Sequence, residues 1–361
     1  MGMRKLTTLV FLSISLTFFC QRTVRFADSI RKVYHIPEIS YAVTNSKAIL
    51  EIAALGKHAV NLPDTASLDD RFHIGSNTKA MTAFMIARYV EKGKLSWTTP
   101  FFEIFPEWKD SSRKEYDRIT LQDLLSNRAR LQAFQGEDDP VIPGFKGTPQ
   151  ETRTAFGKFV LTLAPVDPDS LHPFSYSNAG YTLAALMLER VTHQSWEQLV
   201  EKVFNRDLKL DVKLSWPENQ KTKDTWGHSF EHDKLVPVPS TVSSRLDYTE
   251  PAGDINIRLK DYARFIQLNI QGLEGHSNYL SAKTYQFIHK GLPHYSLGWY
   301  NIYENGKELS THAGTAETYY TLVHIDRIKG LAYIIFTNSF NPDTQQGVRL
   351  LMRKLKENHG R

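Results

Sequence analysis

Apolar and polar positions follow two different periods along this chain, and the two periods occupy different regions. Near the N-terminus, residues 39–55 alternate with a period of two and are interrupted at Asn45-Ser46, a pattern typical of a β-hairpin. Near the C-terminus, the alternating runs on both sides of Asn305-Gly306 and the run over 318–338 predict two further hairpins. Strand-forming sequence therefore comes from both ends of the chain.

Between these regions the pattern has mostly the period of a helix. Residues 178–191 and 259–272 predict two helices, and we expect Gly272 to close the second. Two capping-box spacings, each a hydroxyl residue followed three positions later by Asp or Gln, predict further helix starts at Thr120 and Ser195.

Together these patterns predict an α+β fold. The simplest arrangement is one antiparallel sheet built from both chain ends and flanked by terminal amphipathic helices over 25–35 and 347–358, with a mainly helical lobe inserted between them. Large pockets favour the seam of such a two-lobe body.

The first twenty residues differ from the rest of the chain. Arg4 and Lys5 precede residues 6–19, an uncharged apolar run that is short for a membrane span. This pattern predicts a signal peptide over 1–20 and a single mature domain over 21–361, secreted or periplasmic. An uncleaved membrane anchor is the alternative. Cys20 would suit a lipid-anchored bacterial protein, but the preceding phenylalanine is larger than usual at such a site, so lipidation stays open.

Composition narrows the class of protein. No cysteine follows Cys20, so the mature chain has neither a disulfide nor a cysteine-ligated metal. Without residues 1–20 it has 42 basic and 39 acidic residues, evenly spread, which does not favour nucleic-acid binding.

Residues 71–95 begin polar and continue as an almost wholly apolar segment. On a helix, Ser76 and Lys79 at positions i and i+3 share a face, so the hydroxyl and the amine can meet. The apolar continuation predicts a buried central helix, where burial would lower the pKa of Lys79 and let it act as a base. A solvated helix end is the alternative, because Ser-x-x-Lys also arises by chance, as at Ser111 and Lys114 in a charged run.

Two further motifs follow downstream, in the order that such a serine site requires. Tyr176 and Asn178 form a Tyr-x-Asn motif, and His312, Gly314 and Thr315 lie on a predicted strand after a hairpin. A buried structural tyrosine and a structural strand histidine are the alternative interpretations.

These three motifs resemble those of the serine beta-lactamase-like family, which includes class C beta-lactamases, D-alanyl-D-alanine carboxypeptidases and related esterases. Blocks such as ITLQDLLS, EPAGDINIRLKDYARF and YSLGWY look like that family's blocks in its order, and the resemblance covers most of residues 25–340.

The resemblance implies a beta-lactamase/transpeptidase-like fold and a serine hydrolase that forms an acyl-enzyme with no metal or cofactor. Ser76 would be the nucleophile, while Lys79 and Tyr176 move its proton and the backbone N–H groups of Ser76 and Thr315 form an oxyanion hole. The residues implied to bind a small-molecule or cell-wall peptide substrate are Asn178, His312, Gly314 and Thr315. A D-amino peptidase or esterase is favoured over a beta-lactamase, because His312 replaces the lysine that many beta-lactamases carry.

The chain departs from the family pattern close to the site. Residues 127–131, Asn-Arg-Ala-Arg-Leu, stand where a His-Thr-Ser-Gly-Leu block is usual. The loop is either simply solvated, or Arg128 or Arg130 supplies the positive charge that His312 supplies less reliably near neutral pH. Asp254 stands where a second glycine is common, and a glycine expected shortly after Thr315 is missing.

Two other functions fit parts of the sequence. His228, Glu231 and His232 match a zinc-peptidase motif, but that chemistry needs a helix, and the sequence around them favours a hairpin. A non-catalytic protein that keeps the fold and binds penicillin or cell-wall peptide is the second alternative, which the altered glycines keep open.

Overall fold

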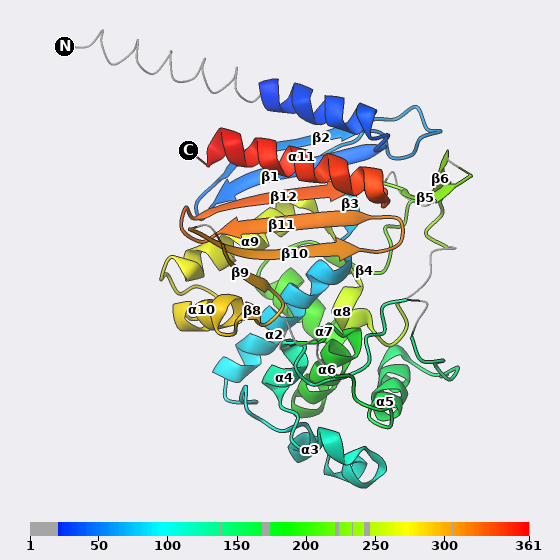
Figure 1. Ribbon diagram of the computed structural model, residues 1–361, viewed down its shortest axis with the longest axis vertical. Coiled ribbons are helices and arrows are strands. Elements are labelled where there is room, and N and C mark those ends of the chain that lie inside the picture. The colour runs from blue at the N-terminus through cyan, green and yellow to red at the C-terminus, as the bar shows by residue number, and fades with distance from the viewer. Residues whose placement is uncertain are drawn as a thin grey trace, which may run out of the picture.

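The centre of the fold is a seven-stranded antiparallel sheet in the order β2-β1-β12-β11-β10-β9-β8 (Figure 1). This computed structural model describes residues 21–136, 139–167, 174–220, 224–232, 234–241, 246–304 and 306–360. The strands of the sheet are β1 (Glu38–Asn45), β2 (Ile49–Gly56), β8 (His294–Tyr295), β9 (Tyr300–Glu304), β10 (Lys307–Thr315), β11 (Tyr320–Asp326) and β12 (Leu331–Thr337). Two strands come from the N-terminal part and five from the C-terminal part, so the predicted fold class is confirmed.

The predicted hairpins are present as strand pairs. Strand β1 pairs with β2, β9 with β10, and β11 with β12, all antiparallel. The turn residue Asn305 lies outside the described residues, whereas the strands on both sides of it pair as predicted.

The sheet is buried on both faces, which explains its largely apolar strands. On β12, Tyr333 and Ile335 pack in one apolar cluster with residues of α11 (Pro342–His359), while Ile334 and Phe336 belong to the cluster on the other face. A helix over residues 21–33 lies with α11 on one face, and α9 (Leu259–Leu273) covers the other (Figure 1). Both predicted terminal helices are present.

The helical lobe is inserted between β2 and β8 and also carries two small sheets. Both predicted capping boxes are confirmed at Thr120 and Ser195. The remaining α-helices are α2 (Thr78–Glu91), α3 (Phe101–Ile104), α4 (Leu121–Leu125), α5 (Pro149–Val160), α6 (Asn178–Thr192), α7 (Trp196–Val200), α8 (Glu250–Gly253) and α10 (Ala282–Lys290). The 3-10 helices are η1 (Gly75–Asn77), η2 (Pro106–Ser111) and η3 (Lys114–Tyr116), and a π-helical turn, η4, spans Glu201–Asp207. The small sheets are β3-β7-β4 (Arg71–His73, Ile255–Arg258, Val212–Leu214) and β5-β6 (Gly227–Glu231, Lys234–Val238).

One helix boundary was predicted wrongly. Gly272 does not cap α9, because the helix continues to Leu273. A Cβ at position 272 would collide with the ring of Tyr285 on α10, so this glycine allows two helices to pack closely. A pattern along one segment cannot reveal a contact with a distant helix.

The predicted signal peptide over 1–20 lies outside the described residues. Within the described ranges, no helix combines the length and apolarity that crossing a membrane requires.

Candidate active site

Ser76 and Lys79 meet at the start of the central helix. Ser76 lies in η1, the 3-10 turn that leads directly into α2, and Lys79 lies in the first turn of α2. Lys79 Nζ is 3.2 Å from Ser76 Oγ. Helix α2 is buried on nearly all sides from Thr78 to Ala87, as its apolar sequence predicts, whereas Ser76 at its start is partly exposed.

The Lys79 amine is completely buried and close to three oxygen atoms. Besides Ser76, it donates to Asn178 Oδ1 at 2.6 Å and to the backbone carbonyl of Ala252 at 3.0 Å. Burial holds the pKa of Lys79 well below its ordinary value of 10.5. In the neutral form of the amine, two N–H groups can bond Asn178 and Ala252, which leaves the lone pair for the Ser76 hydroxyl.

Tyr176 and Asn178 approach the same amine from the segment that enters α6. The ring of Tyr176 lies 4.7 Å from Lys79 Nζ, and its phenol lies close enough to Ser76 to interact with its hydroxyl. Burial raises the pKa of Tyr176 well above 10, so the phenol is protonated. Asn178, the first residue of α6, also donates through Nδ2 to the carbonyl of Phe134 at 2.6 Å. The structure therefore brings the first two motifs together.

Backbone hydrogen bonds from the loop over 127–134 hold this segment in place. The Asn127 carbonyl accepts from Ser175 N at 2.8 Å, and Asn127 Oδ1 accepts from Ser177 N at 3.1 Å. The Ala133 carbonyl accepts from Asn178 N at 2.9 Å. The altered block therefore positions both members of the Tyr-x-Asn motif.

Neither arginine of this loop directs its charge to Ser76. Arg128 donates to the backbone carbonyls of Tyr295 and Pro293, each at 2.7 Å, and so ties the loop to β8. Arg130 donates to the Val166 carbonyl at 3.1 Å and pairs with the carboxylate of Asp167. The hypothesis that one of them supplies a substrate-binding cation is not supported by these contacts.

His312 is buried and neutral. Its Nε2 lies 3.2 Å from Tyr295 Oη, and its Nδ1 lies 2.7 Å from the carbonyl of Ala313. Burial, with a smaller effect from charge on Lys79, lowers the pKa of His312 to about 3. The expectation that this side chain gains charge near neutral pH is therefore not supported. Its ring is 6.2 Å from that of Tyr176, so the third motif also reaches the site.

Gly314 lets β10 pass directly beside the nucleophile. A Cβ at this position would collide with the backbone carbonyl of Ile74, two residues before Ser76. Strand β9 pairs with β10 only as far as Thr311. From His312 to Thr315, β11 pairs with one edge of β10, and in the described residues no strand pairs with the other edge. This edge is open to an extended ligand.

Three supporting groups were not singled out from the sequence. His73 accepts a hydrogen bond from Gly75 N through Nδ1 at 3.2 Å, and its Nε2 lies 3.4 Å from Asp254 Oδ1. Asp254, noted only as a missing glycine, thus helps to hold the turn that carries Ser76. Tyr295 belongs to the block YSLGWY, but its contact with His312 depends on strand pairing. The Ala252 carbonyl, a backbone atom, leaves no signal in the sequence.

The zinc-peptidase motif lies on strands, as predicted. His228 and Glu231 are on β5, which pairs with β6, and His228 is buried against Asn338. Strand β5 ends at Glu231 and His232 lies in the turn that follows, so the two histidines are not presented by one helix as that motif requires. Among the described residues, no group of histidine, cysteine and acidic side chains has the arrangement of a metal site.

Comparisons with known proteins identify relatives of this chain. The family model described as Beta-lactamase matches residues 24–355. Protein flp of Staphylococcus aureus (strain MW2) is 22% identical over 319 residues, covering 84% of this chain and 60% of that protein. The chain thus spans about 60% of the length of the first curated relatives it matches.

Solved structures have the same fold. The octameric penicillin-binding protein homologue from Pyrococcus abyssi superposes with a TM-score of 0.74 at 20% identity, covering 94% of this chain and 77% of that one. The D-amino acid amidase from Ochrobactrum anthropi SV3, complexed with L-phenylalanine amide, superposes with a TM-score of 0.73 at 19% identity, covering 93% and 99%.

Fold and sequence define a protein of the beta-lactamase/transpeptidase class. The chain belongs to the beta-lactamase family.

Proposed function

We propose that this protein is a serine hydrolase that cleaves an amide or ester through an acyl-enzyme on Ser76. The observation that carries the proposal is the buried Lys79 amine, 3.2 Å from Ser76 Oγ and fixed by Asn178 and Ala252. We further propose that residues 1–20 are a signal peptide and that the mature protein acts outside the cytoplasm.

In the proposed acylation step, neutral Lys79 removes the hydroxyl proton as Ser76 Oγ bonds to the substrate carbonyl carbon. The backbone N–H groups of Ser76 and Thr315 stabilise the oxyanion, and one such donor is typically worth ~3–4 kcal/mol. The bond to the leaving amine or alcohol then breaks as Tyr176 gives it a proton, and Lys79 returns its proton to Tyr176. Water repeats these steps on the acyl-enzyme and releases the acid.

The charge of the site favours substrates that have no carboxylate beside the scissile bond. His312 is uncharged, and Arg128 and Arg130 are bound elsewhere, so the three cations considered from the sequence are not available to a substrate carboxylate. An amino acid amide or a neutral ester fits this site better than a peptide with a free C-terminal carboxylate. The D-amino acid amidase among the structural neighbours is in keeping with this preference.

Ser76→Ala is the first test. We expect turnover of a D-amino acid amide or a nitrophenyl ester to fall by roughly 10⁴-fold or more. The chain offers a matched control in Ser111→Ala, the serine of the second Ser-x-x-Lys motif, which should leave turnover unchanged because that hydroxyl binds the carbonyl of Trp108. Retention of most activity in Ser76→Ala would overturn the assignment.

Intact mass after incubation with a penicillin separates hydrolysis from binding without turnover. We expect an adduct on the wild-type protein that is absent from Ser76→Ala. A persistent adduct with no turnover of any amide or ester would favour the non-catalytic penicillin-binding alternative, whereas consumed penicillin would indicate a working beta-lactamase.

A further inference from the structure

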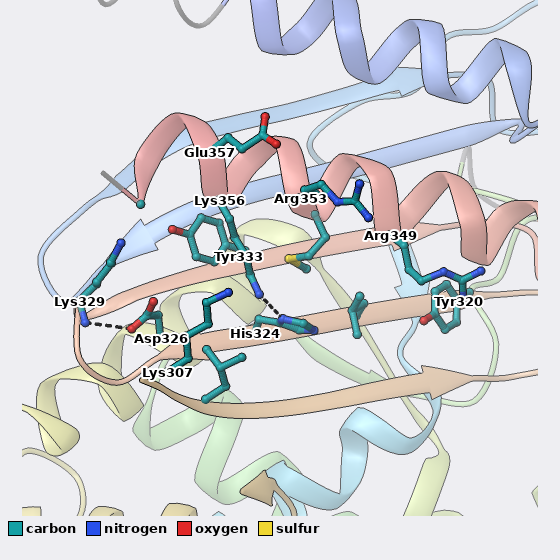
Figure 2. A pocket seen from close by; sticks show the side chains of 14 residues that line it. Lys307, Tyr320, His324, Asp326, Lys329, Tyr333, Arg349, Arg353, Lys356 and Glu357 are labelled. Carbon is teal, nitrogen blue, oxygen red and sulfur yellow. Dashed lines mark hydrogen bonds between the residues drawn. The ribbon is translucent and has the colours of Figure 1, made fainter. Parts of the chain in front are cut away.

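A second cavity lies between the sheet and the C-terminal helix, and the proposed reaction does not use it. It has a volume of about 670 Å³ and is lined by residues of β10, β11, β12 and α11 (Figure 2). Successive residues of a strand point to opposite faces. His312 therefore points to the active-site face, while Lys307 and Leu309 of the same strand line this cavity.

The cavity lining carries an excess of positive charge. Its cations are Lys307, Lys329, Arg349, Arg353 and Lys356, against two carboxylates, Asp326 and Glu357. Asp326 Oδ1 already accepts the backbone N–H groups of Ile328 and Lys329. In the described part of the chain, the side chains of Lys307 and Arg353 have neither a hydrogen-bond partner nor an ion-pair partner.

Two cations from opposite walls extend into the same space. Lys356 of α11 donates to His324 Nδ1 on β11 at 2.6 Å, and Lys307 lies close to this pair (Figure 2). His324 adds no charge, because burial lowers its pKa to about 3. Burial and the charge of Lys307 lower the pKa of Lys356 to about 8. An anion bound here would relieve the repulsion between the two lysines.

The rest of the lining is apolar or aromatic. Leu309, Leu322, Met352, Tyr320 and Tyr333 form this part of the wall. A cavity lined by both cations and apolar or aromatic side chains suits an anionic amphiphile better than a free inorganic anion.

The position of the N-terminal helix indicates where such a molecule would come from. Asn358 of α11 donates to Thr23 Oγ1 at 2.9 Å, so the start of the helix over 21–33 lies beside the end of α11 that lines the cavity. Arg22 and Arg25 are exposed on this helix. The uncharged apolar run 6–19 immediately precedes it in the sequence. In the chain that keeps this run as an uncleaved anchor, instead of losing it as a signal peptide, the membrane would therefore lie close to the cavity.

We propose that this cavity binds the anionic headgroup of a membrane phospholipid. Lys307, Lys356 and Arg353 contact the phosphate, and the apolar wall contacts the start of the acyl chains. The site is independent of the proposed hydrolysis, so either proposal can fail without the other.

Vesicle binding of the full chain tests the proposal. Binding to vesicles of pure phosphatidylcholine gives the contribution of residues 6–19 to membrane affinity. Binding to vesicles rich in phosphatidylglycerol adds the contribution of the anionic headgroup. We expect tighter binding to the second kind, and Lys307→Gln with Arg353→Gln should weaken that binding by about fivefold for each cation removed. The matched control is Lys109→Gln with Lys114→Gln, the same change of charge on exposed residues of the inserted lobe, which should keep the preference.

A charge-neutral variant separates a cavity from a merely basic surface. Leu309→Trp fills the cavity and keeps every cation, so it should also lose the preference for phosphatidylglycerol. Its urea unfolding, measured alongside the wild type, shows that the fold is intact. Retained preference in Leu309→Trp, equal losses in the two double variants, or displacement of the protein by millimolar inorganic phosphate at constant ionic strength would overturn the proposal.

Discussion

A single amine determines what the proposed site can do. Lys79 is completely buried, and burial alone lowers its pKa. Only the neutral amine can accept the Ser76 proton. The acylation rate should therefore rise with pH through the pKa of Lys79 and reach its plateau well below pH 10.5.

Lys79→Arg tests this requirement directly. A guanidinium does not lose its proton in proteins, so the variant keeps a positive group but has no base. We expect kcat/KM to fall by about 10²–10⁴-fold at every accessible pH. Lys114→Arg, the same exchange in the second Ser-x-x-Lys motif, should have no effect, and equal activities of the two variants would contradict a role for Lys79 as base.

At His312 the prediction concerns the shape of a pH profile. Because its pKa is lowered to about 3, the imidazole is neutral throughout the range between about pH 5.5 and 8. His312→Gln should lower kcat/KM, because it disturbs the contact with Tyr295, without changing the shape of the profile in this range. If kcat/KM of the wild type changes with pH around 6.5 and this change is absent in the variant, His312 does gain a proton in this range and binds the substrate as a cation.

At the scale of elements, the loop over 127–134 differs most from expectation. Asn127, Arg130 and Phe134 all have positive φ, at 61°, 58° and 51°. Arg130 stands where the related block has glycine, the residue that adopts this conformation without strain. The loop nevertheless keeps the hydrogen bonds that position the segment of Tyr176 and Asn178, and these bonds help to offset the strain.

Two substitutions at Arg130 separate strain from contact. Both Arg130→Gly and Arg130→Ala remove the bond to Val166 and the exposed pair with Asp167, but only glycine relieves the left-handed backbone. We expect the glycine variant to be more stable than the alanine variant by about 1 kcal/mol in urea unfolding. Neither should raise KM for anionic substrates selectively. A selective rise would restore the cation hypothesis.

The sequence predicted the elements whose patterns are local and long. The hairpins, the buried helix α2, and the helices α6 and α9 each follow from the periodicity of one segment. Predictions failed where the deciding contact is distant in sequence. A glycine is needed at position 272 because the ring of Tyr285 on another helix packs against it. The pKa of His312 is lowered by burial beneath residues of other strands. The positive φ angles of the loop could not be predicted, because residues such as Arg130 do not favour that conformation.

At the scale of the whole molecule, the large sheet must be held against the segment that carries the nucleophile. His58 follows β2, and Asp70 immediately precedes β3, which leads through Ile74 to η1. The buried His58 ring lies between two carboxylates, 2.7 Å from Asp64 and 2.9 Å from Asp70. Asp70 is the larger cause that raises the pKa of His58 to about 9. This ion pair therefore links the main sheet to the strand that leads to Ser76.

The link should make stability depend on pH in a definite direction. The pKa of His58 is raised from 6.5 to about 9, so its contribution is complete below pH 6.5 and is lost as pH rises through 9. A shift of this size corresponds to a loss on the order of 3 kcal/mol in the free energy of unfolding. Urea unfolding at both ends of this range measures it.

His58→Gln provides the comparison, because glutamine can still hydrogen-bond Asp64 but cannot gain a proton. The variant should be less stable than the wild type below pH 6.5, and the difference should shrink toward zero above pH 9. Lysines and tyrosines titrate in both proteins, so their effect cancels when the free energy of unfolding of the variant is subtracted from that of the wild type. A difference that stays constant with pH would mean that His58 is neutral in the fold, and the connection between sheet and nucleophile would then rest on packing alone.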